Sequence, residues 1–177
     1  MMTVLGCIVH SHNPWLVLVA VLICCAGSWV TIRLFQRAAG TSGVQRLGWH
    51  VLTAVAAGAA IWCTHFIAMI GFEPGTPVAF DPVLTVLSLL VAVVGAAPGF
   101  ALACSRRLKF APALGGAVVG VAIVLMHYTG MMAYRVQGLV SWDMGYLVAS
   151  VVISVVVSAL ALHTAARLDR PGMRYAA

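Results

Sequence analysis

Charged side chains are scarce in this sequence, and their scarcity excludes a soluble fold. Only 8% of the 177 residues are charged, whereas 63% are hydrophobic; a soluble domain carries about 25% charged residues. With a mean hydropathy of +1.06, the chain cannot cover a surface that faces water. We therefore expect an integral membrane protein, and the length allows one bundle, residues 1–177, without a second domain.

Acidic residues are rarer still, because the chain has only 4 of them. Glu73, Asp81, Asp143 and Asp169 all fall in loops or at the ends of predicted helices, so no intramembrane acid pair is available for proton pumping or a di-iron site. A glycine-rich phosphate loop is also absent, since the Gly-Gly pair at 115–116 lies inside an apolar run. These absences predict that the chain is not an enzyme.

Cysteine occurs 5 times, an odd number that gives no disulfide framework. Cys24, Cys25 and Cys104 fall in apolar runs, where we expect them to pack. Cys7 lies alone on the segment before the first run. The cysteines therefore do not suggest a cross-linked extracellular scaffold.

Long apolar runs are what the sequence has in abundance. Runs that reach the roughly 20 residues needed to cross a bilayer recur five times. The predicted spans are residues 14–34, 48–71, 82–105, 111–133 and 145–166. They are too long for the strands of a membrane β-barrel, which have about ten residues. The predicted fold class is all-α, a polytopic membrane helix bundle.

Basic residues predict the orientation of these spans. They follow the first, third and fifth spans, in the groups Arg33, Arg37 and Arg46, then Arg106, Arg107 and Lys109, then Arg167, Arg170 and Arg174. Arg135 alone lies on the other side. By the positive-inside rule the N-terminus is outside and the C-terminus is cytoplasmic. The net charge of +6 therefore reflects topology and not a nucleic-acid surface. Because no basic segment precedes the first span, we interpret it as a retained helix.

The sequence also repeats itself with a period of 62 residues. "GAAIWCTHFIAMIGF" at 58–72 aligns with "GVAIVLMHYTGMMAY" at 120–134, and "FDPVLTVLS" at 80–88 aligns with "WDMGYLVAS" at 142–150. Each unit is a helix pair that begins at an Asn or Asp N-cap; the predicted caps are Asn13, Asp81 and Asp143. The third unit begins at Asp143 and is incomplete, since its histidine would fall near position 189. The chain is therefore expected to be a fragment or a shortened form.

The repeat places two histidines at one depth on parallel helices. His65 and Met69 share a helix face in the first copy, and His127 and Met131 share the same face in the second. Both histidines lie about six residues before their helix ends, roughly 9 Å below the outer rim. Imidazole with a soft thioether is a donor set that suits copper. One copy alone would be read as a hydrogen-bonded histidine beside gap-filling methionines; the recurrence favours a metal site.

Further ligands are predicted less directly. His12 precedes the first span at a similar level and is a candidate third imidazole, with His10 as its competitor. Met126 and Cys63 are additional sulfur candidates. Tyr128 hydrogen-bonds or lines the pocket, and it is replaced by Phe66 in the sister copy.

"MHYTGM" at 126–131 and "THFIAM" at 64–69 resemble the signature of the bacterial MHYT domain, an integral-membrane sensor module. The resemblance runs from "HNPWLVLVAVLIC" to the final arginines. It implies a copper site near the outer face of the cytoplasmic (inner) membrane and sensing of oxygen, carbon monoxide, nitric oxide or another diatomic ligand. It also implies a cytoplasmic output domain, since the family often carries GGDEF and EAL domains of cyclic di-GMP metabolism. The implied ligands are His12, His65, Met69, Met126, His127, Tyr128 and Met131. The family has a third motif on a sixth helix, which a second subunit of a homo-oligomer would have to supply here.

Two other functions remain open at this stage. Facing histidines are also axial haem ligands, so an electron-transfer protein is one alternative. Copper transport is the other, although no ladder of histidine or methionine continues across the membrane. No sequence feature suggests nucleic-acid binding; the partners expected are the lipid bilayer, a diatomic or redox ligand and a cytoplasmic signalling partner.

Overall fold

Five long α-helices form the protein in a computed structural model that describes residues 11–105, 108–136 and 142–168. The helices are α2 (Pro14–Gly40), α3 (Gly43–Ile70), α4 (Pro82–Ala103), α5 (Ala111–Ala133) and α6 (Met144–Leu168), and the strands are β1 (Val78–Phe80) and β2 (Tyr134–Val136). All five helices are long and apolar enough to cross a membrane. The chain is therefore a multi-pass membrane protein, and the predicted spans are confirmed apart from α2, which extends beyond residue 34 to Gly40.

The predicted N-caps start three of these helices. Asn13 Oδ1 accepts from the Trp15 amide, and Asp81 Oδ1 accepts from the amides of Val83 and Leu84. Asp143 Oδ1 accepts from the amides of residues 145 and 146 in the same way. Each cap satisfies amide groups that have no partner within the first helical turn. The three helices consequently all enter from the same end of the bundle.

Consecutive helices pack against each other along the chain, from α2 with α3 to α5 with α6. Glycine permits the close approaches. An added Cβ at Gly58 on α3 would lie 2.8 Å from the backbone nitrogen of Val93 on α4. An added Cβ at Gly120 on α5 would lie 2.6 Å from Cα of Val155 on α6. These two contacts are related by the 62-residue shift (58 + 62 = 120 and 93 + 62 = 155), so the repeat governs packing as well as sequence.

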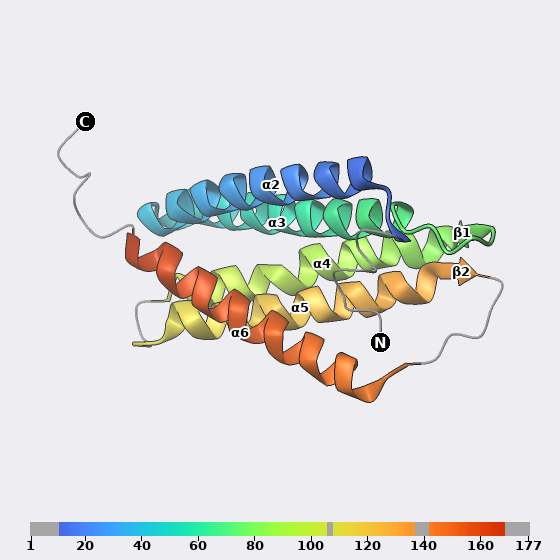
Figure 1. Ribbon diagram of the computed structural model, residues 1–177. Helices are drawn as coiled ribbons and strands as arrows, with labels where there is room; N and C mark the ends of the chain where they lie inside the picture. Colours follow the sequence, from blue (N-terminus) through green and yellow to red (C-terminus); the bar gives the residue numbers. More distant parts are fainter. Residues whose placement is uncertain (1–10, 106–107, 137–141, 169–177) are drawn as a thin grey trace.

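α3, α4 and α5 form the middle of the bundle, and α2 and α6 form its edges. Within the most apolar stretch of each helix, 28–39% of the residues are buried for the middle three but 6% for each edge helix. Figure 1 shows α6 running obliquely to the other helices, with its start swung away from them. The bundle is therefore open between α2 and α6.

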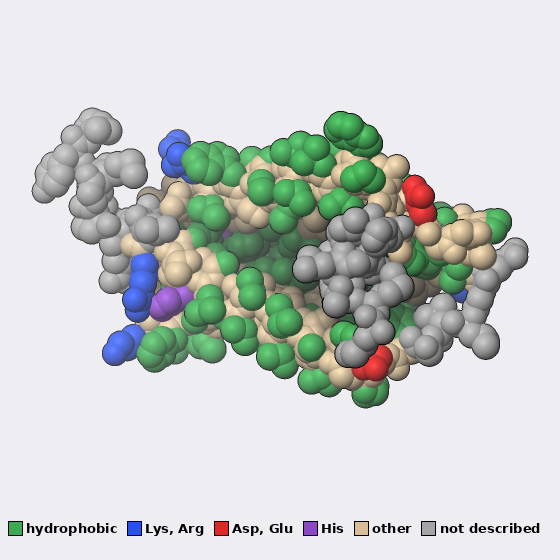
Figure 2. Space-filling model, viewed as in Figure 1, with side chains coloured by type: hydrophobic (Ala, Val, Ile, Leu, Met, Phe, Trp, Pro, Cys, Tyr) green, Lys and Arg blue, Asp and Glu red, His purple; other side chains and the backbone are tan. Residues whose placement is uncertain are grey.

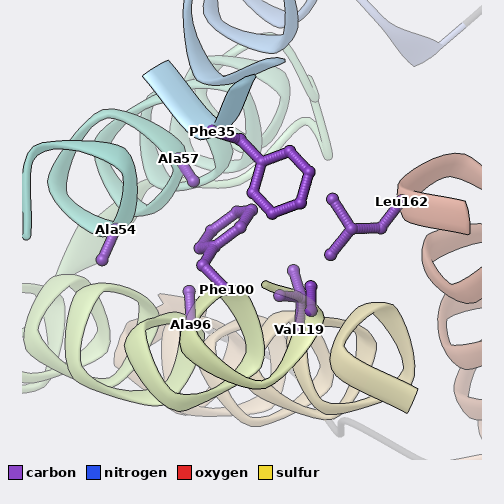
Figure 3. Close-up of a cluster of buried hydrophobic side chains, with 8 residues drawn as sticks. Phe35, Ala54, Ala57, Ala96, Phe100, Val119 and Leu162 are labelled. Atoms are coloured by element: carbon purple, nitrogen blue, oxygen red, sulfur yellow. The ribbon is translucent and has the colours of Figure 1, made fainter. Parts of the chain in front are cut away.

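A cluster of buried side chains packs the half of the bundle that contains the basic turns. Figure 3 shows the Phe35 and Phe100 rings at its centre, with centroids 6.0 Å apart, and Leu162 of α6 facing them. Small residues around the rings, including Ala54, Ala57 and Ala96, let the helices approach. Aromatic and small side chains together hold the histidine-bearing helices α3 and α5 in register.

The surface matches a protein embedded in lipid. Figure 2 shows hydrophobic side chains over the flank, Lys and Arg at one end and Asp and Glu at the other. Both tryptophans expected at the interfaces are exposed, Trp15 by 74% and Trp142 by 48%.

Two short backbone pairings close the acidic end, and the sequence did not predict either. β1 pairs antiparallel with β2, with Ala79 opposite Arg135. The segment before α2 pairs with the loop after α3: the Asn13 amide donates to the Gly71 carbonyl at 2.7 Å, and the Glu73 amide donates to the Ser11 carbonyl at 2.9 Å. These pairings tie the repeat units together beside the predicted site.

Candidate metal centre

The structure brings the two repeated histidines into contact. His65 Nδ1 on α3 and His127 Nδ1 on α5 are 3.3 Å apart. The ring centroids are 4.9 Å apart, and the planes meet at 70°. Both side chains are partly buried. Residues that are 62 positions apart in the chain therefore form one site, at the equal depth that the repeat predicts.

Gly130 on α5 makes room for the His65 ring. A Cβ at position 130 would lie 2.5 Å from His65 Nε2 and 2.9 Å from Cδ2. His65 Nε2 is buried without a hydrogen-bond partner among the described residues. Sequence reasoning did not single out Gly130, although the motif "HYTGM" contains it and the sister copy has Ala68 at the matching position. The glycine determines how closely His65 can approach α5.

A cavity of about 300 Å³ lies on the outer side of the histidine pair. It is lined by His12, His65, Ala68, Met69, Phe72, His127, Met131 and Tyr134. Five of the seven predicted ligands therefore share one cavity. The backbone pairing between the start of the chain and the loop after α3 places His12 here, and the His12 ring contacts Phe72 at 5.2 Å.

Met126 and Tyr128 lie on the other side of the pair. They line an inner cavity of about 330 Å³ that also includes Thr64, Ser150 and the same two histidines. Met126 is almost fully buried, with 1% of its surface exposed. Tyr128 donates its hydroxyl hydrogen to Ser150 Oγ at 2.8 Å, because Ser150 Oγ itself donates to the Leu147 carbonyl. The histidine pair thus separates an outer cavity that contains thioethers from an inner cavity that contains hydroxyl groups.

No group of three or more His, Cys, Asp or Glu side chains close enough to hold a metal ion occurs among residues 11–105, 108–136 and 142–168. The closest set is the histidine pair, with His12 further along the same cavity wall. Cys63 is half-buried on α3 and is not among the residues that line either cavity. Any ligands beyond the two imidazoles would therefore be thioethers, His12 after a local movement, or a bound small molecule.

One ion pair stands next to the outer cavity. Arg135 on β2 lies 3.3 Å from Asp81 Oδ2. The Leu84 backbone amide and then the Arg135 guanidinium hold the pKa of the Asp81 carboxyl below its ordinary value. Burial raises the pKa of the Tyr134 phenol, which lines the cavity. The acid that caps α4 therefore also anchors the strand that follows α5.

Comparison with known proteins agrees with the repeat found in the sequence. The family model for MHYT, described as a bacterial signalling protein N terminal repeat, matches residues 58–116 and 120–177. The two matches begin 62 residues apart (120 − 58 = 62), which is the period of the internal repeat. No solved structure matches this chain.

Three curated relatives are signalling proteins. An uncharacterized signaling protein of Caulobacter vibrioides is 40% identical over 94% of this chain and 21% of its own length. The bifunctional diguanylate cyclase/cyclic di-GMP phosphodiesterase MucR of Pseudomonas aeruginosa is 34% identical over 94% of this chain and 24% of its own length. The cyclic di-GMP phosphodiesterase NbdA of the same organism is 33% identical over 71% of this chain and 16% of its own length. The chain therefore spans less than a quarter of the length of these relatives.

Proposed function

Since the chain belongs to the MHYT family of bacterial signalling proteins and is itself a membrane sensor domain, we propose that it binds copper at the histidine pair near its outer end. The site reports a diatomic ligand or a redox change to a cytoplasmic partner. The enzymatic activities named for MucR and NbdA belong to those proteins. A cyclic di-GMP output joined to this chain or bound by it is part of the proposal.

The separation of the two imidazole nitrogens carries this proposal. Two nitrogens that bind one ion in tetrahedral geometry, at about 2.0–2.1 Å each, lie roughly 3.3–3.4 Å apart. His65 Nδ1 and His127 Nδ1 are 3.3 Å apart. A hydrogen bond between two neutral rings also gives this distance, so the metal experiment below decides between the two interpretations.

The chemistry of the remaining donors favours copper. Met69 and Met131 line the cavity on the outer side of the pair, and soft thioethers with imidazole select Cu(I) over harder cations. Carboxylates would favour a harder ion, and none lines either cavity. When bound, copper would supply a centre whose ligation and redox state respond to small molecules.

The geometry favours a single ion over haem. Two axial imidazoles on opposite sides of an iron hold their nitrogens about 4 Å apart, with the porphyrin plane between them. His65 and His127 touch directly, with ring centroids 4.9 Å apart. A haem would therefore require α3 and α5 to separate.

The cavities also favour sensing over transport. A further cavity of about 210 Å³ continues from the inner cavity toward the basic end of the bundle, and none of its lining residues is histidine, methionine or cysteine. A copper pathway across the membrane needs successive ligands, and the described residues offer none below the pair. The centre is therefore terminal, which suits a sensor.

Orientation and output complete the proposal. The basic residues place the histidine end outside the cytoplasmic membrane, the N-terminus outside and the C-terminus in the cytoplasm. Ligand binding shifts the protein only if the ligand favours one of two helix arrangements. The loosely packed α6, which carries the chain to the C-terminus, is the helix best suited to such a shift.

The test is metal analysis with optical and EPR spectra on protein purified in detergent and loaded with copper. We expect one copper per chain in the wild type and loss of most of it in His65→Ala and in His127→Ala. His163→Ala is the matched control, because it removes a histidine at the opposite end of the bundle and should retain copper. Unchanged copper content in the double variant His65→Ala/His127→Ala would refute the site.

A further inference from the structure

A groove at the basic end of the bundle is separate from the histidine site. It lies at the turn between α2 and α3, has a volume of about 710 Å³, and is lined by Gln36, Arg37, Gly40, Thr41, Gln45, Gly48, Trp49 and Leu52. None of these residues lines the outer or inner cavity. The groove therefore needs an explanation of its own.

The charge around this groove has no counterpart in the described part of the protein. Five described cations lie at this end, Arg33, Arg37, Arg46, Lys109 and Arg167. The described acids Glu73, Asp81 and Asp143 all lie at the other end, where Asp81 pairs with Arg135. Figure 2 shows this separation of blue and red side chains. The groove thus presents positive charge that only an anion from outside the described chain can balance.

Arg37 is the cation that lines the groove. Its guanidinium carbon lies 5.6 Å from the centroid of the Trp49 ring across the groove. The neighbouring Arg33 contacts Trp29 at 4.7 Å and does not line the groove. Arg46 donates to the Cys104 carbonyl at 2.8 Å. A planar guanidinium held beside a ring presents a fork of donors that matches phosphate oxygens.

Polarity changes along the α3 wall of the groove. Gln45, Trp49 and Leu52 follow one another at helical spacing and share a face. The sequence along this face runs from an amide at the helix start, through an indole, to an aliphatic side chain that is 51% exposed within the span. Tryptophan is typical of the level where lipid headgroups meet acyl chains. The wall therefore matches a molecule with a polar head and an apolar chain.

We propose that this groove binds the phosphodiester headgroup of an anionic phospholipid. Arg37 contacts the phosphate, Gln36 and Gln45 contact the glycerol part, and one acyl chain lies along Trp49 and Leu52. Anionic headgroups concentrate in the cytoplasmic leaflet, where basic pockets between membrane helices bind them. The source is the bilayer and not a soluble phosphate compound, because the groove continues onto the lipid-exposed face of α3.

The experiment compares lipid retention in native mass spectrometry of protein taken from nanodiscs. Nanodiscs of phosphatidylcholine with phosphatidylglycerol are compared with nanodiscs of phosphatidylcholine alone. We expect the wild type to retain one phosphatidylglycerol and Arg37→Gln to retain it about fivefold more weakly. Arg37→Lys should be intermediate, since it keeps the charge and loses the planar fork.

Arg33→Gln is the matched control, because it removes the same charge from the same helix one turn away. It should retain the lipid like the wild type. Equal loss in Arg33→Gln and Arg37→Gln would show diffuse surface attraction and overturn the site, as would equal retention of phosphatidylcholine. Displacement by millimolar glycerol phosphate would identify a soluble ligand and overturn the lipid assignment.

Arg37 is exposed and forms no contact in the core, so the variants should fold, and circular dichroism checks this. The outcome does not depend on copper, which is left out of every sample. Failure of the metal proposal and failure of the lipid proposal are therefore distinguishable.

Discussion

The two repeat units, α3 with α4 and α5 with α6, share their packing but differ in how they treat their aromatic side chains. In both units a serine of the second helix holds an aromatic ring from the first. Trp62 Nε1 donates to Ser88 Oγ at 3.1 Å in the first unit, and Tyr128 donates to Ser150 Oγ at 2.8 Å in the second. Ser88 and Ser150 are equivalent positions, whereas Trp62 and Tyr128 are not.

The difference reflects the positions of the two units in the bundle. α4 lies in the middle, and Phe66, the equivalent of Tyr128, is buried with 6% of its surface exposed. α6 lies at the edge, and Tyr128 faces the inner cavity. The same motif therefore supplies a buried aromatic side chain in one copy and a cavity-lining one in the other. Repetition conserves the histidine and the glycine contact, while the surroundings decide what the neighbouring side chains do.

The largest effects are expected at the glycine contacts. Gly58→Ala and Gly120→Ala each drive a methyl group into the backbone of the next helix, and overpacking of this kind costs about 1–3 kcal/mol. Gly120→Ala should cost less, because α6 is an edge helix and can shift. Unfolding in mixed detergent measures both; a larger loss for Gly120→Ala would contradict the description of α6 as the looser helix.

Gly130→Ala should displace the His65 ring and leave the fold intact. The new methyl group would meet a side chain and not the backbone, so we expect copper affinity to fall about tenfold, which corresponds to about 1.4 kcal/mol. Ala68→Gly, at the equivalent position of the first unit, is the control and should bind copper like the wild type. Competition with a colorimetric Cu(I) chelator gives both values.

The aromatic–serine contacts can be broken one at a time. Tyr128→Phe removes one hydrogen bond and should cost about 1 kcal/mol of stability; it should leave copper binding unchanged because the hydroxyl is engaged with Ser150. Trp62→Phe should cost more, since Trp62 Nε1 also donates to the Thr85 carbonyl and the smaller ring leaves a void. A marked loss of copper in Tyr128→Phe would make the tyrosine a ligand after all.

The smallest effect is expected from acid at the Asp81–Arg135 pair. The pKa of Asp81 is lowered in the folded protein, so its carboxylate stabilises the fold above the ordinary pKa of about 3.9. That stabilisation is lost as the pH falls through the lower folded value. Asp81→Asn and Arg135→Gln should both flatten the dependence of unfolding on pH below about 4. If both variants keep the wild-type slope, the ion pair does not contribute.

Much of this fold was predictable because the bilayer imposes simple rules. Helix number and approximate bounds follow from apolar length, and the caps at Asn13, Asp81 and Asp143 follow from side-chain chemistry. The meeting of His65 with His127 followed from the 62-residue period, since equal depth on parallel helices is a property of the repeat. The role of Gly130 was not predictable, because its partner lies on another helix.

The sequence by itself determined the membrane class, the five helices, the repeat and the pairing of the two histidines, since each depends on composition or on spacing along one helix. Only the tertiary structure decided that Met69 and Met131 lie outside the pair while Met126 and Tyr128 lie inside it. Only the tertiary structure brought His12 beside Phe72 and opened the bundle between α2 and α6. The physical reason is that helical periodicity sets depth and face, whereas the partner that each face meets depends on how separate helices and loops pack together.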